Sequence, residues 1–426
     1  MARRVQLVCW GSRGDVAPLI GLGRGLQAAG DSVALMAARD FEGLVRSAGL
    51  DFVPFDIDLR ATADSAEGRS WLGGHRTLVG EGLAMQRVLE RFKGPLVEGL
   101  WERTGDADLV VSGLLTADAC LSLTAARGQQ HAVALLAPLL PSSRGLSSAS
   151  APLPGRDTRL NLLAGQAILA SSYRLLQVPG GEIRRRLGHR RTQPWWFWKH
   201  ITAAPTLLGV SRYVVPPPLD QPQVHVTGYW PGWGGDPEPP AEVAARLDAA
   251  LDRARERGRP VAYLGFGSMT TADPGGTAAL LVEAAERAGV HPVVHSGWSG
   301  LDRHLGGRPD VTVVDHVPHS WLFPRCDAVV HHGGAGTTGA AVRAGAPQVV
   351  VAHMGDQPFW AAQMRRLGVA SPPLRRTGLR PARLADALRA VTVGPHADDI
   401  RRSALHLASL AAAEDGVAAG VAALRT

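Results

Sequence analysis

The sequence has few cysteines, almost no lysine and no long apolar run. Its three cysteines, Cys9, Cys120 and Cys326, are far apart and form no CxxC pair. An odd number of scattered cysteines argues against a disulfide framework and favours a reducing compartment. No window approaches the roughly 18 apolar residues of a membrane span, and the N-terminus lacks the apolar segment of about 7–15 residues that a secretory signal needs. These absences predict a soluble, cytoplasmic protein with at most peripheral membrane contact.

Because lysine is nearly absent, the positive charge of the chain comes from arginine. Lys93 and Lys199 are the only lysines, yet the formal net charge is +7. The basic stretches are short, as in EIRRRLGHRR at residues 182–191, and no RNA- or DNA-binding motif accompanies them. A cluster of this size is typical of a solvated helix face, and we expect no nucleic-acid partner. Contact with acidic lipid head groups is the alternative.

Apolar segments of strand length alternate with segments of helix length along most of the chain. A chain of 426 residues is expected to form two domains, at roughly 100–200 residues each. The alternation predicts an α/β protein with two doubly wound, mostly parallel sheets facing each other. The expected division is an N-terminal domain at 1–213, a linker rich in proline and glycine at 214–240, a second domain at 241–400 and a helical tail at 401–426. The first domain is one candidate packing surface for that tail.

Two other stretches stand out by composition. PSSRGLSSASAPLPG at 141–155 is rich in serine, proline and glycine and is predicted to be a mobile loop. QPWWFWKH at 193–200 places three tryptophans and a phenylalanine at consecutive positions, Trp195 to Trp198. Core packing explains some of these aromatics, but four adjacent side chains cannot all face one core from a single element. The wall of an apolar pocket, or a lid over one, is the alternative.

The most specific motif is HHGGAGTTG at residues 331–339, which follows an apolar run of strand length. Gly334, Gly336 and Gly339 spell GxGxxG at the expected start of a helix, and Asp356 follows 20 residues after Gly336. This pattern is the dinucleotide fingerprint, so an NAD(P)-dependent oxidoreductase is one hypothesis. In any such turn, the N–H groups and the dipole at the helix N-terminus favour a phosphate.

Three features favour a different phosphate compound. The turn lies late in its domain rather than after the first strand. Asp356 is followed by Gln357, and such an acceptor–donor pair suits a hexose with several hydroxyl groups. His331 and His332 precede the glycines, and a ring N–H at this place can donate to a diphosphate oxygen. Of the two histidines, His331 is the one for which a structural role is expected.

At these motifs the chain resembles family-1 glycosyltransferases of the GT-B fold, in the branch with sterol glucosyltransferases and bacterial antibiotic (natural-product) glycosyltransferases. The matching stretches are GSRGDVAPLIGLGRGLQAAG at 11–30, VTGYWP at 226–231, GFGSM at 265–269 and the long block at 317–364. They cover both expected domains in order, and the last block is specific. The resemblance implies an enzyme that moves a hexose from UDP-glucose, or from a dTDP-sugar, to a hydroxyl of an apolar acceptor such as a sterol, terpenoid or polyketide. It implies no tightly bound cofactor.

The resemblance also implies roles for individual residues, with the donor in the second domain and the acceptor in the first. Diphosphate contacts are implied for Ser268, His332, Gly334, Gly336, Thr337 and Thr338. Sugar contacts are implied for Asp356 and Gln357, and nucleobase contacts for Trp298 and for the backbone of Val317. Turn formation by Ser268 and core packing of Trp298 are the alternatives. Relatives often carry Arg or Lys where this chain has Ser296, so the choice between uridine and thymidine nucleotides stays open.

Sugar transfer needs a stabilised leaving diphosphate and a base for the acceptor hydroxyl. A helix N-terminus and His332 can stabilise the leaving diphosphate through fixed dipoles, without a metal. The DID triplet at 56–58 has the form of a DxD pair that could hold a metal, but it lies in the other domain. Asp15, in GSRGD after the first strand, is implied by the resemblance as the general base of an inverting displacement. Asp118, after a later strand, is a candidate for an assisting or orienting group. Helix capping is the alternative for both aspartates, and a non-catalytic partner that binds nucleotide sugars is a third hypothesis for the chain.

Overall fold

The computed structural model describes residues 2–63, 65–68, 78–189, 199–231, 238–269, 271, 273–308, 310–315 and 317–425. Within these ranges the chain forms two compact units. One contains the described residues up to 231 together with 414–425, and the other contains those from 238 to 413. The aromatic stretch at 195–198 lies outside the described residues, so its role stays a prediction.

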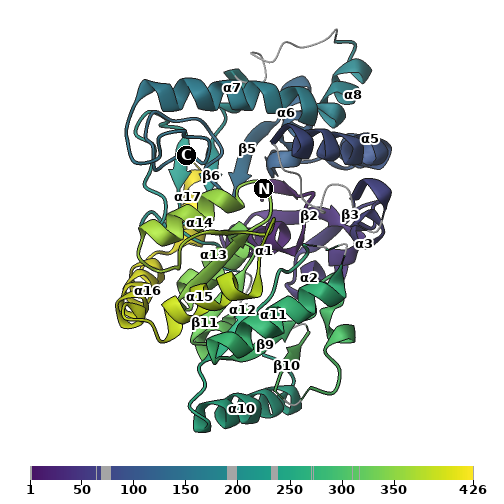
Figure 1. The fold of residues 1–426 in the computed structure, drawn as a ribbon. Helices are drawn as coiled ribbons and strands as arrows, with labels where there is room; N and C mark the ends of the chain where they lie inside the picture. The colour runs from purple at the N-terminus through teal and green to yellow at the C-terminus, as the bar shows by residue number, and fades with distance from the viewer. Residues whose placement is uncertain are drawn as a thin grey trace. The chain divides into compact units, whose positions relative to one another are not determined.

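The first unit is built on a parallel sheet. Its described residues form seven strands in the order β3-β2-β1-β4-β5-β6-β7 (Figure 1). The strands are β1 Arg4–Val8, β2 Ser32–Ala38, β3 Asp51–Phe55, β4 Leu109–Ser112, β5 Gln130–Leu135, β6 Thr206–Leu208 and β7 Val224–Val226. The strand order reverses between β1 and β4, where Val8 pairs with Ser112. Ligands of open α/β sheets bind at the carboxyl ends of the strands at such a point.

Helices cover this sheet in the way that the apolar spacing predicts. They are α1 Arg13–Ala28, α2 Glu42–Ser47, α3 Leu59–Ala63, α5 Leu78–Arg103, α6 Ala117–Arg127, α7 Arg159–Leu176, α8 Val178–Arg186 and α17 Gly416–Ala423. In α1, the apolar residues at helical spacing, among them Val16, Leu19 and Leu26, are buried. Val5, Leu7 and Val8 of β1 are also buried, because a parallel strand covered on both faces needs a continuous apolar run.

The second unit repeats this architecture. Among its described residues are six strands in the order β10-β9-β8-β11-β12-β13. The strands are β8 Val261–Leu264, β9 His291–His295, β10 Thr312–Val314, β11 Ala328–His331, β12 Gln348–Ala352 and β13 Leu374–Arg375. The helices are α10 Ala241–Glu256, α11 Pro274–Ala288, α12 His319–Leu322, α13 Ala335–Arg343, α14 Gln357–Arg366, α15 Pro381–Thr392 and α16 Ala397–Ala412.

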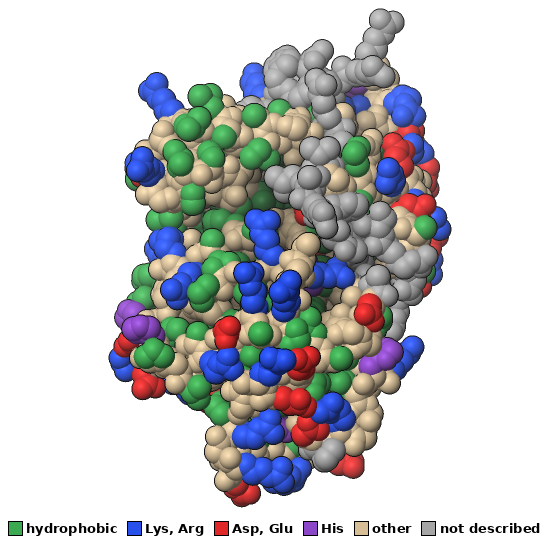
Figure 2. All heavy atoms as spheres, viewed as in Figure 1, with side chains coloured by type: hydrophobic (Ala, Val, Ile, Leu, Met, Phe, Trp, Pro, Cys, Tyr) green, Lys and Arg blue, Asp and Glu red, His purple; other side chains and the backbone are tan. Residues whose placement is uncertain are grey.

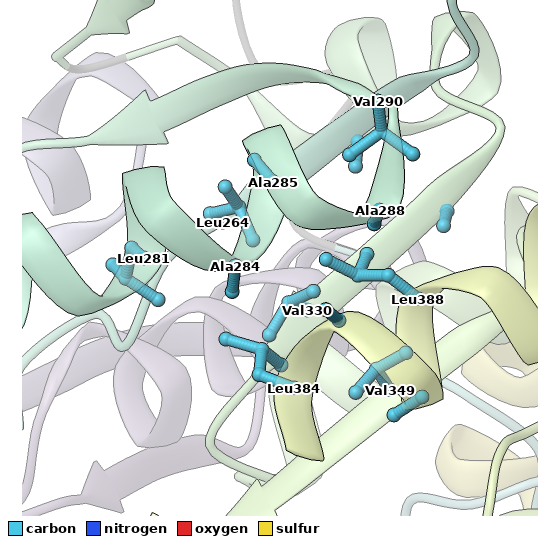
Figure 3. Packing of buried hydrophobic residues seen from close by; sticks show 14 of the residues in the cluster. Leu264, Leu281, Ala284, Ala285, Ala288, Val290, Val330, Val349, Leu384 and Leu388 are labelled. Carbon is cyan, nitrogen blue, oxygen red and sulfur yellow. The ribbon is translucent and has the colours of Figure 1, made fainter. Parts of the chain in front are cut away.

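The two faces of the second sheet carry different helices. On one face, α11 and α15 pack on strand residues such as Leu264, Val330 and Val349 (Figure 3). The neighbouring strand residues Tyr263 and Val329 point the other way, into a core with α10, α12 and α13. Because successive side chains of a strand alternate between faces, α13 lies on the opposite face of the sheet from α11 and α15.

The predicted fold class, α/β with two doubly wound parallel sheets, is confirmed. The observed boundaries differ from the expected ones in two places. β7 pairs with β6 in the first sheet, so part of the stretch expected to be a linker at 214–240 is a strand. The expected boundary at residue 400 falls inside α16, and the segment that joins the first unit begins at Glu414. Within that segment α17 packs on α1, where a β carbon at Gly25 would overlap Val417.

Residues 141–155, predicted to be a mobile loop, are held by hydrogen bonds at several points. Ser142 Oγ donates to Asp220 Oδ1 at 2.6 Å, and Ser143 donates to Asp220 Oδ2 from its N–H at 2.6 Å and from its hydroxyl at 2.7 Å. The side-chain amide of Asn161 in α7 bonds both backbone groups of Leu153. Composition could not indicate this, because Asp220 is far away in sequence.

We expect Gly21→Ala in α1 to lower the free energy of unfolding by about 1–3 kcal/mol, as overpacking does. A β carbon at Gly21 would overlap the carbonyl oxygen of Pro231, and a backbone oxygen cannot rotate away. Gly43→Ala in α2 is the matched control, because nothing lies within 4 Å of its β carbon. We expect the control to be neutral or stabilising by up to about 1 kcal/mol. Urea unfolding followed by circular dichroism measures both, and equal losses would contradict the packing role of Gly21.

Candidate active site: a phosphate-binding helix end and a capped aspartate

The motif at residues 331–339 forms the strand, turn and helix that its pattern predicts. β11 ends at His331, Gly334 is the N-cap of α13, and the helix begins at Ala335. Gly334 has no side chain that could cap the helix, and the first turn of α13 contains no acidic residue. The N–H groups of that turn are therefore available to a ligand, and no carboxylate offsets the partial positive charge of the helix end.

His332 lies beside this helix end, between two glycine turns. A β carbon at Gly334 would overlap His332 Nε2, and one at Gly267 would lie 3.4 Å from His332 Cε1. The ring is buried, and its Nδ1 has no hydrogen-bond partner among the described residues. Burial lowers the pKa of His332 well below its ordinary value, and the neighbouring histidines lower it further. A neutral imidazole with an unsatisfied ring nitrogen is suited to bind a polar ligand at this place.

Thr338 provides a second buried polar atom at the same helix end. Its side chain is buried, and Oγ1 has no hydrogen-bond partner among the described residues. Gly336 and Thr337, in the first turn of α13, are half-buried. A buried polar group without a partner costs stability, typically about 1–3 kcal/mol. We call His332, Gly334, Gly336, Thr337 and Thr338 the α13 cradle.

His331 has a different environment although it is adjacent in sequence. It is fully buried, and its Nδ1 accepts a hydrogen bond from the backbone N–H of Gly333 at 3.1 Å. Its Nε2 therefore carries the proton and donates to Gln348 Oε1 at 2.9 Å. Burial lowers the pKa of His331 to about 4. Both ring nitrogens are used within the protein, which agrees with the structural role expected for this residue.

The turns that carry Ser268 and Trp298 are joined to each other. The backbone N–H of Trp298 donates to the carbonyl oxygen of Gly267 at 3.2 Å. A β carbon at Gly297 would lie 2.8 Å from the same oxygen, and Gly297 has φ +60°, so glycine is required here. Ser268 and Trp298 are both half-buried, at the carboxyl ends of the neighbouring strands β8 and β9. Their predicted contacts with the nucleotide remain predictions.

Val317 packs its side chain in the core that contains Trp321 and Phe323. Its backbone is therefore the part of the residue that a nucleobase could meet, as the resemblance implies. This contact also remains a prediction.

Asp356 and Gln357 lie at the start of α14, after β12. Asp356 is the N-cap, and Trp360 Nε1 donates to its Oδ2 at 2.7 Å. Gln357 Oε1 accepts hydrogen bonds from the backbone N–H groups of His353 at 2.7 Å and Met354 at 3.0 Å. The carbonyl end of Gln357 is thus used by its own turn, and its Nε2 lies 3.7 Å from the sulfur of Met269. If Gln357 contacts a sugar, the amide N–H₂ is the group that would donate to it.

His353 was not predicted from the sequence, yet it lies next to the α13 cradle. Its ring centroid is 6.4 Å from that of His332 and 4.9 Å from that of Phe266. Nδ1 donates to the carbonyl oxygen of Val351 at 2.8 Å, and burial lowers the pKa of His353 to about 4. The available signal was its place directly after β12, because polar residues at the carboxyl ends of parallel strands are site candidates.

A cavity of about 140 Å³ opens at the carboxyl edge of the same sheet. Its lining includes Phe266, Gly267, Ser296, His353 and Arg376, together with side chains from α11. It therefore lies on the α11 face of the sheet and adjoins the α13 cradle without containing it.

We expect Gly334→Ala to weaken the binding of UDP by at least about tenfold without unfolding the protein. The added methyl group would overlap His332 Nε2 and displace the ring from the helix end, and loss of one charge-assisted hydrogen bond is worth about 1.5–3 kcal/mol. Isothermal titration with UDP measures the affinity, and circular dichroism checks the fold. Unchanged affinity would show that the place of His332 is unimportant for binding.

Asp15 lies in the first turn of α1, where its carboxylate forms a capping box with Ser12. Ser12, and not Asp15, is the N-cap residue, which corrects the capping alternative. Asp15 Oδ2 accepts hydrogen bonds from the Ser12 N–H at 2.8 Å and from the Ser12 hydroxyl at 3.0 Å. Desolvation raises the pKa of Asp15, and the two hydrogen bonds from Ser12 oppose this without cancelling it. Asp15 as a whole residue is exposed, whereas its carboxyl group packs against Gly11 and Ser12 and is the desolvated part.

Asp118 lies inside a buried network and is not a cap. Thr116 is the N-cap residue of α6, and Asp118 forms an ion pair of 2.7 Å with Arg184 of α8. Arg184 also donates to Ser122 Oγ at 2.9 Å and to Tyr173 Oη at 3.0 Å. Burial raises the pKa of Asp118, and Arg184 opposes that shift. The pairing fits an orienting role for Asp118 better than a role as base.

The same network revises the prediction for the basic stretch at 182–191. Arg184 is buried and joins α8 to α6, whereas the exposed Arg185 and Arg186 pair with Glu182 and Glu98. The stretch is therefore a solvated helix face only in part.

The fold and the candidate site describe a protein of two doubly wound α/β units, with a helix end in the second that no side chain caps. Residues 302–418 match the family described as erythromycin biosynthesis protein CIII-like, C-terminal domain. The chain is 30% identical over 451 residues to a sterol 3-beta-glucosyltransferase of Aspergillus clavatus, in an alignment covering 99% of this chain and 29% of that protein. It thus spans less than a third of the length of that relative.

Solved structures of similar fold are glycosyltransferases. The calicheamicin glycosyltransferase CalG4 superposes with a TM-score of 0.67 at 18% identity, over 100% of this chain and 97% of that one. The Streptomyces glycosyltransferase SsfS6, complexed with thymidine diphosphate, gives 0.61 at 20% identity over the whole of both chains. At these identities the likeness concerns the fold. In sequence and in fold the chain is thus similar to glycosyltransferases of the GT-B fold.

Proposed function

We propose that this protein transfers a hexose from a nucleotide-diphosphate sugar to a hydroxyl group of an apolar small molecule, with inversion at the anomeric carbon. The observation that carries the proposal is the α13 cradle, where an uncapped helix N-terminus meets the unsatisfied Nδ1 of His332 and Oγ1 of Thr338. The similar sterol glucosyltransferase and the thymidine diphosphate complex of a structural neighbour support a donor of this class. An NAD(P)-dependent oxidoreductase has no such support.

In this proposal the second unit holds the donor and stabilises the departing diphosphate. The first-turn N–H groups of α13 would bind phosphate oxygens, and His332 would donate one further hydrogen bond. These dipoles are fixed before the reaction, so they need no reorganisation as negative charge develops on the leaving group. Ser268 would add a hydroxyl donor from the turn after β8, and Asp356 and Gln357 would bind the sugar.

The first unit would hold the acceptor and supply the base. Asp15 would take the proton of the acceptor hydroxyl. The hydroxyl oxygen of the acceptor would at the same time attack the anomeric carbon from the face opposite the diphosphate. A raised pKa makes a carboxylate a better base, and the residue is exposed at the start of α1, where an acceptor could approach it. Asp118 would act as a positioning residue, because its pair with Arg184 joins α6 to α8.

We propose that this transfer requires no divalent metal. The cradle already provides dipoles and hydrogen-bond donors that can stabilise the negative charge of the leaving group. In other transferases a metal ion stabilises this charge. Turnover is therefore expected to be unchanged by EDTA and by added Mg²⁺. We also propose that the protein works in a reducing compartment, the cytoplasm; its three free, buried cysteines are compatible with this proposal.

The proposed donor is a nucleotide hexose, and the proposed acceptor is an apolar molecule with a hydroxyl group. UDP-glucose is the first donor to test, and a dTDP-hexose is the second because Ser296 leaves the nucleobase choice open. For the acceptor we propose a sterol, a terpenoid or a polyketide, which all present a hydroxyl on an apolar body. The resemblance and the sterol glucosyltransferase relative support this class.

A product assay tests the proposed function directly. Purified protein is incubated with UDP-glucose or a dTDP-hexose and a small library of hydroxylated apolar compounds, with products detected by mass spectrometry. From an α-linked donor we expect a β-linked product, which the proton coupling at the anomeric carbon identifies by NMR. Retention of configuration would exclude the inverting role of Asp15. Binding of a nucleotide sugar without any product would favour the non-catalytic hypothesis.

A further inference from the structure

The outward face of α7 is apolar, which is the reverse of the usual pattern for a surface helix. Leu160, Leu163 and Ile168 expose 53%, 61% and 41% of their surface, and Leu153 in the preceding loop exposes 39%. Ala167 is also exposed. We call Leu153, Leu160, Leu163, Ala167 and Ile168 the α7 face. Exposed apolar patches of this kind mark sites of interaction.

The helical residues of this face form one stripe. At 100° per residue, Leu160, Leu163, Ala167 and Ile168 lie along one side of the helix. The neighbouring side of α7 is used within the protein, because Asn161, which lies next to Ile168 on the helical wheel, is fully buried, and a β carbon at Gly165 would lie 2.7 Å from Pro141. The apolar stripe therefore points away from the unit while the polar Asn161 points into it.

Hydrogen bonds fix the position of the α7 face. Asn161 holds Leu153 through bonds of 2.9 and 3.1 Å to its backbone groups. The side chain of Thr158 caps the helix by accepting from Leu160 N at 3.3 Å. The loop leucine and the helical stripe are therefore parts of one built surface, rather than separate exposed residues.

Basic residues outnumber acidic ones in α7 and in the loop before it. α7 contains no acidic residue along its 18 residues. Arg156 and Arg159 are exposed, and neither forms an ion pair with any residue that the structure describes. The nearby Arg144 pairs with Asp157 at 2.6 Å. Figure 2 shows hydrophobic side chains over α7 on the viewed face, with basic side chains at its end and no acidic ones among them.

The size and charge of this surface suit a lipid bilayer better than a second copy of the chain. Its large residues are only partly exposed, so the patch is smaller than the ~800 Å² per partner that a stable protein interface buries. A second copy would also bring Arg156 and Arg159 near their equivalents. A bilayer with anionic lipid accepts the leucines in its interface and attracts the arginines, as it does for amphipathic interfacial helices.

We propose that the α7 face docks the first unit on the surface of a membrane that contains anionic lipid. The contact is peripheral, and no helix among the described residues is long and apolar enough to cross a bilayer. If the proposed function holds, docking would also bring the acceptor site to the phase in which an apolar acceptor concentrates. The docking itself does not depend on that function.

Vesicle flotation tests the proposal with the full chain. We expect the wild-type protein to float with vesicles of phosphatidylcholine and phosphatidylglycerol and to bind less to phosphatidylcholine alone. The triple variant Leu160→Gln, Leu163→Gln, Ile168→Gln should bind at least about tenfold more weakly, because the buried apolar area sets the affinity. Arg156→Gln with Arg159→Gln should weaken binding about tenfold and reduce its salt dependence.

A matched control uses exposed leucine and valine side chains elsewhere. Leu219, Val393 and Leu405 are 74%, 60% and 55% exposed, and changing all three to Gln should leave flotation unchanged. Circular dichroism and stabilisation by UDP check that each variant is folded, so failure to dock is distinguishable from failure to bind the donor.

Three outcomes would overturn the proposal. The first is that the wild-type protein floats with neither kind of vesicle. The second is that the control triple variant weakens flotation as much as the α7 variant does. The third outcome is a dimer in analytical ultracentrifugation that the α7 variant dissociates without any vesicle binding by the wild type. That result would assign the face to a second copy of the chain.

Discussion

His332→Ala is expected to lower kcat/KM for sugar transfer by about 100–1,000-fold, the usual effect of removing one preorganised donor to a developing negative charge. The ring lies at the end of α13, and its Nδ1 has no partner among the described residues. Its loss would therefore remove the proposed contact with the diphosphate and no hydrogen bond of Nδ1 within the described part of the protein. We expect most of the decrease in kcat, because the hydrogen bond strengthens as the diphosphate leaves.

His331→Ala is the matched control, because the two histidines are neighbours with opposite environments. His331 bonds Gly333 and Gln348 through its two ring nitrogens. Its removal leaves buried partners unsatisfied and should lower the free energy of unfolding by about 1–3 kcal/mol. The kcat of the protein that remains folded should change much less than in His332→Ala. Wild-type turnover in His332→Ala would remove this residue from the mechanism.

Asp15→Asn is expected to lower kcat by about 100–10,000-fold, the range that a general base contributes. The amide oxygen of Asn can still accept the hydrogen bonds that Ser12 donates to Asp15. The cap is therefore kept while the base is lost. Steady-state kinetics with a fixed donor and acceptor measure the effect. If Asp15 were only a cap, Asn would support turnover close to that of the wild type.

The pH dependence gives a second readout for Asp15. Desolvation raises its pKa above the ordinary value for aspartate, and a base must be deprotonated to act. Turnover should therefore fall as the pH is lowered through this raised pKa, and Asp15→Asn should abolish that acidic limb.

Stability should respond to the same substitution in the opposite sense. A carboxyl group whose pKa is raised in the folded state contributes stability below its unfolded pKa and loses that contribution as the pH rises through the folded pKa. Above that pKa the charged carboxylate is less stable in the folded protein than in the unfolded chain. Asp15→Asn should then melt at the same temperature as the wild type or higher, so a loss of activity could not be attributed to unfolding.

The fold could be predicted from the sequence because its signals are local. Alternating apolar segments predict parallel strands covered by helices, and the GxGxxG pattern predicts that Gly334 lies between β11 and α13. The C-terminal segment illustrates the limit. Apolar spacing predicts helices there, but it cannot show that α16 stays in the second unit while α17 packs on α1 in the first.

The candidate site was predicted less completely because its details depend on residues that are distant in sequence. The environment of His331 is set by Gln348 on the neighbouring strand. Asp118 was expected to be a cap or an assisting group, but its partner Arg184 is 66 residues away. The orientation of the Gln357 amide depends on the backbone N–H groups of His353 and Met354. A pattern of residue types does not show which distant residue pairs with a side chain or how that side chain is oriented.

The position of bound UDP in a crystal of the complex tests the central claim most directly. We expect the diphosphate at the N-terminus of α13, with its oxygens within hydrogen-bond distance of the first-turn N–H groups and of the His332 ring. UDP bound at another place, with the end of α13 left to solvent, would contradict the assignment of this helix end as the donor site.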